Sequence, residues 1–183
     1  EPAESLEIQN FRSNIAQALF HVEGKPLSLL DYPMYTAIYD GHYPRLLLKT
    51  GRQVAKSTTI ASFMIAECIG QPHFKTYYVS PSQEQTRKFS HTRIAKILSY
   101  SPEVRKGFVG AESIDNVLLR MLKNGSEMAF TYALDNPDRA RGFSADRCAF
   151  DEVQDMLYEP VVPVIEECMA NSKYAYSMYA GTP

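Results

Sequence analysis

The sequence predicts an α/β fold, with a mostly parallel central sheet flanked by helices. Short β-rich runs alternate with longer runs of helical periodicity, which is the pattern of βαβ units. The chain has 183 residues, of which 45% are hydrophobic and 22% charged, as expected of one soluble globular domain. The predicted core strands span residues 45–50, 75–80, 147–150 and 174–180.

Helices and a hairpin are predicted between these strands. Residues 56–69 and 82–98 repeat apolar side chains at helical spacing, so both segments are expected to pack on the sheet. Two β-like runs flank an Asn-Gly pair, the strongest short hairpin signal, which predicts an antiparallel hairpin over 117–132. The next segment, 133–146, is rich in turn formers and arginine and is expected to be an exposed loop.

Composition and charge argue against several classes of protein. The formal net charge of −2 gives no general attraction to nucleic acid, so DNA contact would require a local basic patch or another domain. No apolar run is long enough for a bilayer, and no basic start precedes an apolar core at the N-terminus, so a cytosolic, untargeted protein is expected. Three widely spaced cysteines without a C-x-x-C pair predict reduced thiols and no structural zinc.

The segment LLLKTGRQVAKSTTIASF, residues 46–63, has the outline of a phosphate-binding loop with few glycines. A Walker A motif reads G-x-x-x-x-G-K-[ST]. When the sequence is aligned on Lys56 and Ser57, the two glycine positions fall on Thr50 and Ala55, and Gly51 lies one place late. The context still fits, because an apolar strand leads into the loop and a helix begins at the lysine.

The loop is therefore predicted to bind a nucleotide. Lys56, expected at an exposed helix start, would contact the β- and γ-phosphates, and the Ser57 hydroxyl would hold Mg²⁺, while backbone N–H groups surround the phosphates. Ala55 is the weak position, because alanine tolerates a positive φ less well than glycine. The alternative is a chance Lys-Ser pair at a helix start. The predicted nucleotide-binding residues are Thr50, Gly51, Arg52, Gln53, Val54, Ala55, Lys56, Ser57 and Thr58.

A second motif, RCAFDEVQD, places two carboxylates at the end of a short apolar strand. Ligands bind beyond the carboxyl ends of strands in open α/β sheets. Asp151 is predicted to hold Mg²⁺ and Glu152 to orient the attacking water, because phosphoryl transfer to water needs both functions. The alternative is a solvated acidic pair with no function. At the end of the chain, Gly181 and Thr182 follow a core strand and could sense a γ-phosphate, although a plain β-turn explains them equally well.

With the three motifs in this order, the chain resembles the ATPase domain of large terminase subunits, the DNA-packaging motors of tailed bacteriophages. That family's loop reads RQ-x-G-K-[ST], and residues 52–57 match it except at Ala55. The segment 78–89 resembles the one that couples to DNA, and AFDEVQD and AGTP resemble Walker B and the coupling motif. The resemblance implies a P-loop NTPase fold of the ASCE/RecA-like class with a β-hairpin insertion, using ATP and Mg²⁺ as cofactors.

The resemblance covers residues 44–183 as the ATPase core and leaves 1–43 as an N-terminal helical segment on the adenine side. It implies a nuclease domain that this chain lacks, so the chain is expected to be a fragment. It also implies an arginine finger. Arg141, in an Arg-Gly pair, is the first choice and would act in trans, with Arg139 second and Arg52 assisting in cis. The alternative is a solvated arginine pair.

The expected function is ATP hydrolysis that drives double-stranded DNA into a procapsid. The family implies a portal protein and a small terminase subunit as partners, a homo-oligomeric ring, no membrane contact, and the cytoplasm of an infected bacterium. Two alternatives stay open at this point. One is a helicase-like DNA translocase, which shares both Walker motifs, and the other is a non-hydrolysing nucleotide-binding or scaffold module.

Overall fold

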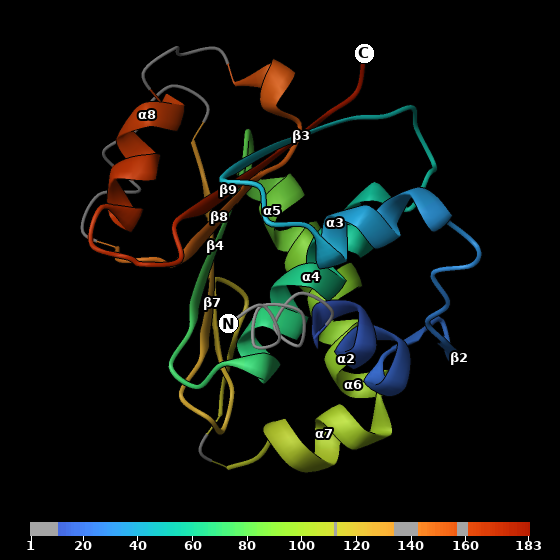
Figure 1. Ribbon diagram of the computed structural model, residues 1–183. Helices are drawn as coiled ribbons and strands as arrows, with labels where there is room; N and C mark the ends of the chain where they lie inside the picture. Colours follow the sequence, from blue (N-terminus) through green and yellow to red (C-terminus); the bar gives the residue numbers. More distant parts are fainter. Residues whose placement is uncertain (1–10, 112, 134–142, 157–160) are drawn as a thin grey trace, which may run out of the picture.

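The computed structural model describes residues 11–111, 113–133, 143–156 and 161–183, which are built around one seven-stranded sheet (Figure 1). The strand order is β3-β9-β8-β4-β7-β6-β5; the first five strands are parallel, and β6 and β5 are antiparallel to their neighbours. The bounds are β3 (Arg45–Lys49), β4 (Lys75–Ser80), β5 (Ile114–Asn116), β6 (Leu119–Met121), β7 (Glu127–Tyr132), β8 (Arg147–Phe150) and β9 (Tyr176–Gly181).

The prediction of a mostly parallel sheet is confirmed, and all four predicted core strands are present. The strand predicted over 174–180 begins two residues later, and the one over 45–50 ends one residue earlier. Strand β9 lies between β3 and β8, so the last strand of the chain separates the two strands that carry the Walker motifs. The three predicted motifs therefore follow the carboxyl ends of three neighbouring strands and lie at the same end of the sheet.

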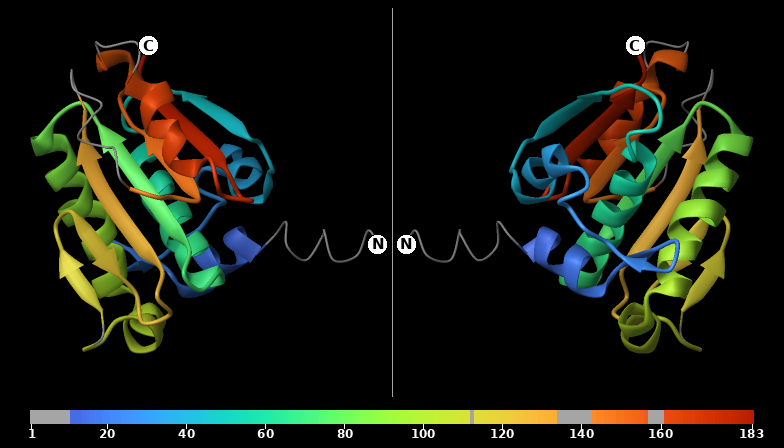
Figure 2. Two further views of the ribbon diagram at one scale, coloured as in Figure 1. Left: turned by 90° about the vertical axis from the view of Figure 1, so that its left-hand side faces the viewer. Right: turned by 90° about the vertical axis from the view of Figure 1, so that its right-hand side faces the viewer.

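Helices cover both faces of the sheet (Figure 2). Helix α8 lies on one face, and the remaining helices lie on the other, with α4 between the sheet and α2. The bounds are α2 (Phe11–Leu19), α3 (Thr36–Asp40), α4 (Lys56–Gly70), α5 (Gln83–Phe89), α6 (Ala95–Tyr100), α7 (Pro102–Phe108) and α8 (Val161–Glu166). Short helical turns are η1 (Pro33–Tyr35), η2 (Ser90–Ile94), η4 (Val153–Asp155) and η5 (Glu167–Met169).

Alternate residues of the central strands point to opposite cores. Tyr78 of β4 and Ala149 of β8 belong to the core under α4, whereas Val79 and Phe150 belong to the core under α8. A sheet that is covered on both faces needs apolar side chains at successive positions, which is why these strands read as continuous apolar runs. The same reasoning applies to α4, where nearly every residue is buried because the helix is enclosed between the sheet and the N-terminal helices.

The helix predicted over 82–98 is confirmed with an irregularity in its middle. Ser82 caps it, forming a capping box with Gln85, and the helical run α5, η2 and α6 continues to Tyr100. The middle turn, η2, is π-helical, and the Ser90 carbonyl accepts from the N–H of Ala95 and from the Arg120 guanidinium. Sequence periodicity did not predict the π-turn, because one extra residue in a turn leaves the apolar spacing nearly unchanged.

The hairpin predicted over 117–132 is confirmed as β6 and β7, with Gly125 at φ +78° in its turn. It is part of the main sheet, since β7 pairs in parallel with β4 along its whole length. Strand β5, which extends the antiparallel edge, was not predicted. Near the N-terminus, β1 (His21–Val22) and β2 (Lys25–Pro26) form a small separate hairpin that was also missed. None of the described helices has the length and hydropathy to cross a bilayer.

Candidate nucleotide-binding site

The loop between β3 and α4 has the backbone of an anion-binding nest. Gln53 and Ala55 have φ values of +60° and +58°, while Val54 between them does not have a positive φ. Such alternation turns successive N–H groups toward one side, where they can surround an anion. Ala55 therefore occupies the left-handed conformation at a cost of about 1–2 kcal/mol. The loop is also held from the N-terminal segment, because the Tyr35 hydroxyl donates to the Val54 carbonyl.

Lys56, the first residue of α4, joins the three predicted motifs. Its Nζ lies 3.1 Å from Glu152 Oε1, 3.7 Å from Asp151 Oδ1 and 3.3 Å from Thr182 Oγ1. The fold brings these residues together because α4, β8 and β9 all meet at the carboxyl edge of the sheet. The lysine was expected at an exposed helix start, and this expectation is wrong, since the residue is only 8% exposed. Two carboxylates and a hydroxyl enclose it.

A cavity of about 480 Å³ lies over the loop. Thr50 is not one of the residues that line it; its N–H donates to the Gly181 carbonyl at 3.3 Å and connects the start of the loop to the end of β9. Asp151 lies in an adjoining cavity of about 260 Å³, which it shares with Ser57. Of the predicted site residues, the larger cavity is lined by Gly51, Arg52, Gln53, Val54, Ala55, Lys56, Ser57, Thr58, Glu152 and Thr182.

The predicted finger residues Arg139 and Arg141 fall outside the described part of the chain. Arg52 lies inside it, exposed at the edge of the larger cavity. It is therefore placed to reach a ligand bound on its own loop.

The two carboxylates occupy different electrostatic environments. Asp151 is 5% exposed and accepts hydrogen bonds from the Tyr78 hydroxyl and the Glu152 N–H, each at 3.0 Å. Burial raises the pKa of Asp151 by more than Lys56 lowers it. Burial also acts to raise the pKa of Glu152, but hydrogen bonds from Gln154 and Lys56 outweigh it, so this pKa is lowered. Glu152 is thus held as an anion beside the cavity.

Substituting Asp151→Asn is expected to stabilise the fold while weakening Mg²⁺-dependent nucleotide binding. Because the folded-state pKa is raised, ionised Asp151 opposes folding at neutral pH, and this cost disappears as the pH falls below its unfolded pKa. The neutral amide removes that cost, so the melting temperature should rise by about 2–4 °C at pH 7, corresponding to roughly 1 kcal/mol. Thermal melts of both proteins across pH 4 to 8 measure this, with the difference shrinking toward low pH.

A melting temperature for the Asp151→Asn protein that is unchanged or lower at pH 7 would contradict this account. So would a gain that is largest at low pH. Tyr78→Phe is the matched control, since it removes a donor to the same carboxylate without changing its charge.

Gln154 is a site residue that sequence reasoning missed. Its Nε2 donates to Glu152 Oε2 at 2.7 Å, and its Oε1 accepts from the Thr182 N–H at 3.3 Å. It thus links the Walker B carboxylate to the predicted coupling residue. Gly181 makes room for this bridge, because a Cβ there would lie 2.8 Å from Gln154 Oε1. The only sequence signal was the position of Gln154 two residues after a candidate catalytic carboxylate.

Arg93 was also missed. It lies in the π-turn η2 and lines both cavities, so it contributes a cation from a different element than the loop. Gln85 of α5 lines the same two cavities. A π-turn often occurs at functional sites, where the extra residue re-aims side chains. Because residues 82–98 were predicted from their apolar spacing as a helix packed on the sheet, nothing in that pattern marked Arg93 as a site residue.

The comparisons with known proteins agree with this geometry. Residues 32–161 match the family model described as the phage terminase large subunit gpA, ATPase domain. No curated relative matches the sequence at a significant level. Several solved structures are similar in fold.

The large terminase of bacteriophage HK97 has a TM-score of 0.76 at 15% identity, covering 94% of this chain and 37% of that one. The ATPase domain of the large terminase from Thermus phage P74-26 has a TM-score of 0.66 at 19% identity, covering 80% and 62%. A large terminase from a thermophilic bacteriophage in complex with ADP has a TM-score of 0.59 at 12% identity, covering 75% and 33%.

These likenesses, all under 25% identity, show the fold, and this chain spans about a third of the two longer terminases. Membership of the family is shown by the family model, which matches most of the chain, from before the phosphate-binding loop to beyond Walker B. The chain belongs to the family of the phage terminase large subunit gpA ATPase domain.

Proposed function

We propose that this chain hydrolyses ATP and that hydrolysis drives double-stranded DNA into a viral procapsid. The observation that carries the proposal is the position of Lys56, whose ammonium lies within 3.7 Å of Asp151, Glu152 and Thr182, beside the nest formed by the loop. Those groups are the ones that phosphoryl transfer to water requires at one place. The family and the ADP-bound structural neighbour support a nucleotide as the ligand.

Each residue has a distinct role in this mechanism. The loop N–H groups and Lys56 bind the phosphates and neutralise their charge. Glu152, held ionised by Gln154 and Lys56, orients the attacking water toward the γ-phosphate and accepts its proton as the general base. Arg93 and Arg52 face the same cavity and would stabilise charge on the transferred group.

The site also fits Mg²⁺. The Ser57 and Asp151 side chains share one small cavity and offer hard oxygen donors, which Mg²⁺ prefers. These two residues would hold the ion together with phosphate oxygens, and the bound ion would supply neutralisation of the phosphate charge. The high pKa of buried Asp151 fits this role, because a nearby divalent cation would offset the cost of its ionisation.

A short relay could carry the state of the nucleotide to the sheet. Lys56 donates to Thr182, Thr182 donates to Glu152 at 3.4 Å, and Gln154 bridges both residues. Loss of a γ-phosphate would change the partners of Lys56 and so the position of Thr182 at the end of β9. This strand lies beside β3, so the end of β9 can transmit a displacement to the loop through Thr50.

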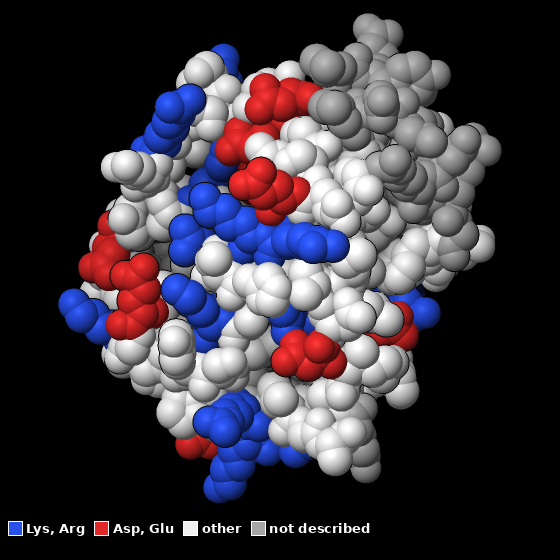
Figure 3. All heavy atoms as spheres, turned by 180° about the vertical axis from the view of Figure 1, so that it is seen from behind, with Lys and Arg blue, Asp and Glu red and all other residues white. Residues whose placement is uncertain are grey.

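DNA would bind on a local basic surface, because the chain has a net charge of −2. Lys and Arg side chains form a band across the face on which α5 and η2 lie, below a group of acidic side chains (Figure 3). Exposed Arg87 and Lys88 of α5 belong to the segment that resembles the DNA-coupling part of the family. Because that segment offers only a few cations, Arg87 and Lys88 among them, its binding to DNA should be weak and strongly salt-dependent.

Phosphate release from Mg-ATP tests the proposal directly. Wild-type protein should release phosphate in a reaction that EDTA abolishes, and the rate per chain should rise with protein concentration, because Arg141 is proposed to act in trans within a ring.

Mixing Arg141→Ala with Lys56→Ala chains should restore part of the activity that each lacks. An absence of phosphate release at every concentration, together with normal ATP binding, would instead indicate a non-hydrolysing module. Full activity of a dilute monomer would exclude the trans arrangement.

A further inference from the structure

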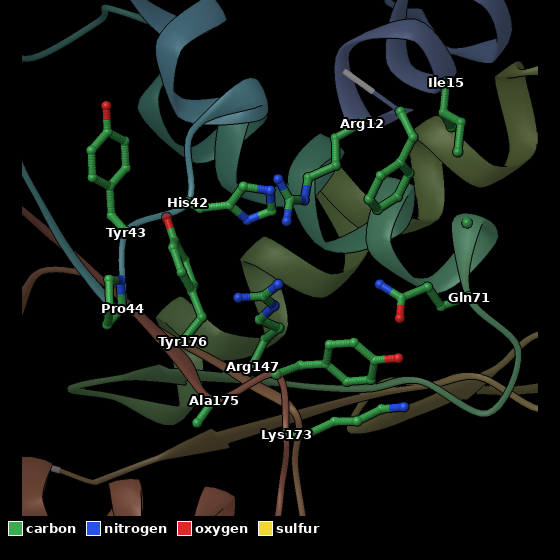
Figure 4. Close-up of a pocket in the computed structure, with 13 residues that line it drawn as sticks. Arg12, Ile15, His42, Tyr43, Pro44, Gln71, Arg147, Lys173, Ala175 and Tyr176 are labelled. Carbon is green, nitrogen blue, oxygen red and sulfur yellow. The ribbon is translucent and has the colours of Figure 1, made fainter. Parts of the chain in front are cut away.

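A larger cavity, of about 750 Å³, lies at the amino ends of the parallel strands, at the opposite end of the sheet from the nucleotide site (Figure 4). It is formed where the chain enters β3, β8 and β9, between the end of α4 and the start of α2. The amino ends of the parallel strands meet there, so no residue of the Walker motifs takes part. Its floor consists of the buried or nearly buried side chains of Arg12, Arg147 and Tyr176, and its rim includes the exposed residues His42, Tyr43, Lys173 and Tyr174.

The two arginines of the floor have one ion-pair partner between them in the described part of the chain. Arg12 Nε lies 2.5 Å and Arg147 Nη2 lies 3.4 Å from the same carboxylate oxygen of Glu67, which is fully buried. Two guanidinium groups thus share one carboxylate. His42 adds little to this positive charge, since partial burial and the two neighbouring arginines lower its pKa and favour its neutral form. Lys173 adds another cation at the rim.

Two buried hydrogen-bond donors of this floor have no partner within the described part of the chain. They are the hydroxyl of Tyr176, a residue that is 3% exposed, and the Nε of Arg147. A buried donor without a partner costs about 1–3 kcal/mol, so such groups are rare and call for an explanation. Arg147 and Tyr176 border one space, the cavity, with the Arg147 guanidinium carbon 4.7 Å from the centroid of the Tyr176 ring (Figure 4). An anion in that space would accept hydrogen bonds from both donors and offset the positive charge of the two arginines.

The walls are largely aromatic or apolar. Phe11 and Ile15 of α2 form one side, and Pro44 and Tyr174 belong to the segments that enter β3 and β9. Flat rings packed near cations favour a planar ligand, because ring stacking and cation–π contact add to burial. The volume is in the range of small-molecule sites. We propose that this cavity binds a small aromatic anion, a planar ring that bears a phosphate or carboxylate group.

Phenyl phosphate and benzoate are suitable probes, with benzylamine as a cationic ligand of the same shape. Binding is followed through the amide resonances of residues 42, 43 and 173–176, which line the cavity, and of 51–58, which report the P-loop. We expect at least one of the two anions to shift the first group of resonances, and benzylamine to shift none. Binding of benzylamine with equal affinity, or shifts of both anions only in residues 51–58, would overturn the proposal.

Tyr176→Phe is the decisive variant, because it removes only the unpartnered hydroxyl. It should weaken binding of the probe about tenfold, as expected for loss of one hydrogen bond to a charged group, while the melting temperature stays the same or rises. Tyr100→Phe, at an exposed position on α6, is the matched control and should leave binding unchanged. Equal affinity of wild-type and Tyr176→Phe proteins would show that the hydroxyl has no ligand and would refute the proposal.

Discussion

Substituting Glu152→Gln is expected to reduce ATP turnover by roughly 10²–10⁴-fold while nucleotide binding persists, the range typical of losing a general base. The amide keeps the size of the side chain and its reach toward Lys56, but it cannot accept a proton from water. Glu152 is suited to this role because hydrogen bonds from Gln154 and Lys56 keep its pKa low and its carboxylate at the edge of the cavity. Single-turnover phosphate release and a separate nucleotide titration measure the two quantities.

Asp155→Asn is the matched control for this experiment. Asp155 lines the same cavity from η4, three residues further along the chain, but its side chain is exposed and makes no contact with Lys56 in the described structure. The control should therefore retain most of its turnover. Equal and small effects of both substitutions would favour a solvated acidic group without a catalytic role.

The elements that were predicted well are those whose own residues show how they are buried, without knowledge of distant contacts. Strands β4 and β8 are covered on both faces, so each reads as an unbroken apolar run bounded by polar residues. Helix α4 follows a strand and a loop in the order that any phosphate-binding loop requires, and its first residue was identified correctly. The positions of Lys56, Asp151 and Glu152 at one sheet edge follow from the same rule about parallel strands.

What sequence could not predict depends on contacts between distant residues. The order of strands is set by crossovers, so nothing in the sequence of β9 revealed that it lies between β3 and β8. The hydrogen bond from Tyr78 to Asp151 joins residues 73 positions apart, and its effect on the carboxylate could not be inferred from either segment alone. Arg93 reaches the cavity through a π-turn, which has no clear periodic signature.

Lys56 illustrates both outcomes. Its motif predicted the residue that the fold places beside the other two motifs. The expectation of an exposed side chain was wrong, because spacing along the chain does not show that Asp151, Glu152 and Thr182 fold over it. This correction changes what its removal should do. A lysine at an exposed helix start would matter for ligand binding alone, whereas a lysine enclosed by two carboxylates also contributes to folding.

Lys56→Ala is therefore expected to lower ATP affinity by roughly 10²-fold, through the loss of charge-assisted hydrogen bonds to phosphate, and also to lower stability at neutral pH. Without the ammonium, Asp151 and Glu152 repel one another, and the pKa of Asp151, already raised by burial, rises further. Because a raised folded-state pKa favours the protonated form, the loss of stability should be present at pH 7 and diminish as the pH falls toward 4.

Nucleotide titration combined with thermal melts from pH 4 to 8 measures both effects of Lys56→Ala. Lys49→Ala is the matched control. Lys49 is the last residue of β3 and has an exposed side chain, and its substitution changes the net charge of the protein by the same amount as Lys56→Ala. The control should keep both nucleotide affinity and stability. Unchanged ATP affinity of Lys56→Ala would contradict the assignment of the P-loop itself. A third outcome is the expected loss of ATP affinity together with a loss of stability that does not vary with pH. It would leave the assignment of the P-loop intact but show that Lys56 does not compensate the charge of the buried carboxylates, because only ionisable partners make its contribution to stability depend on pH.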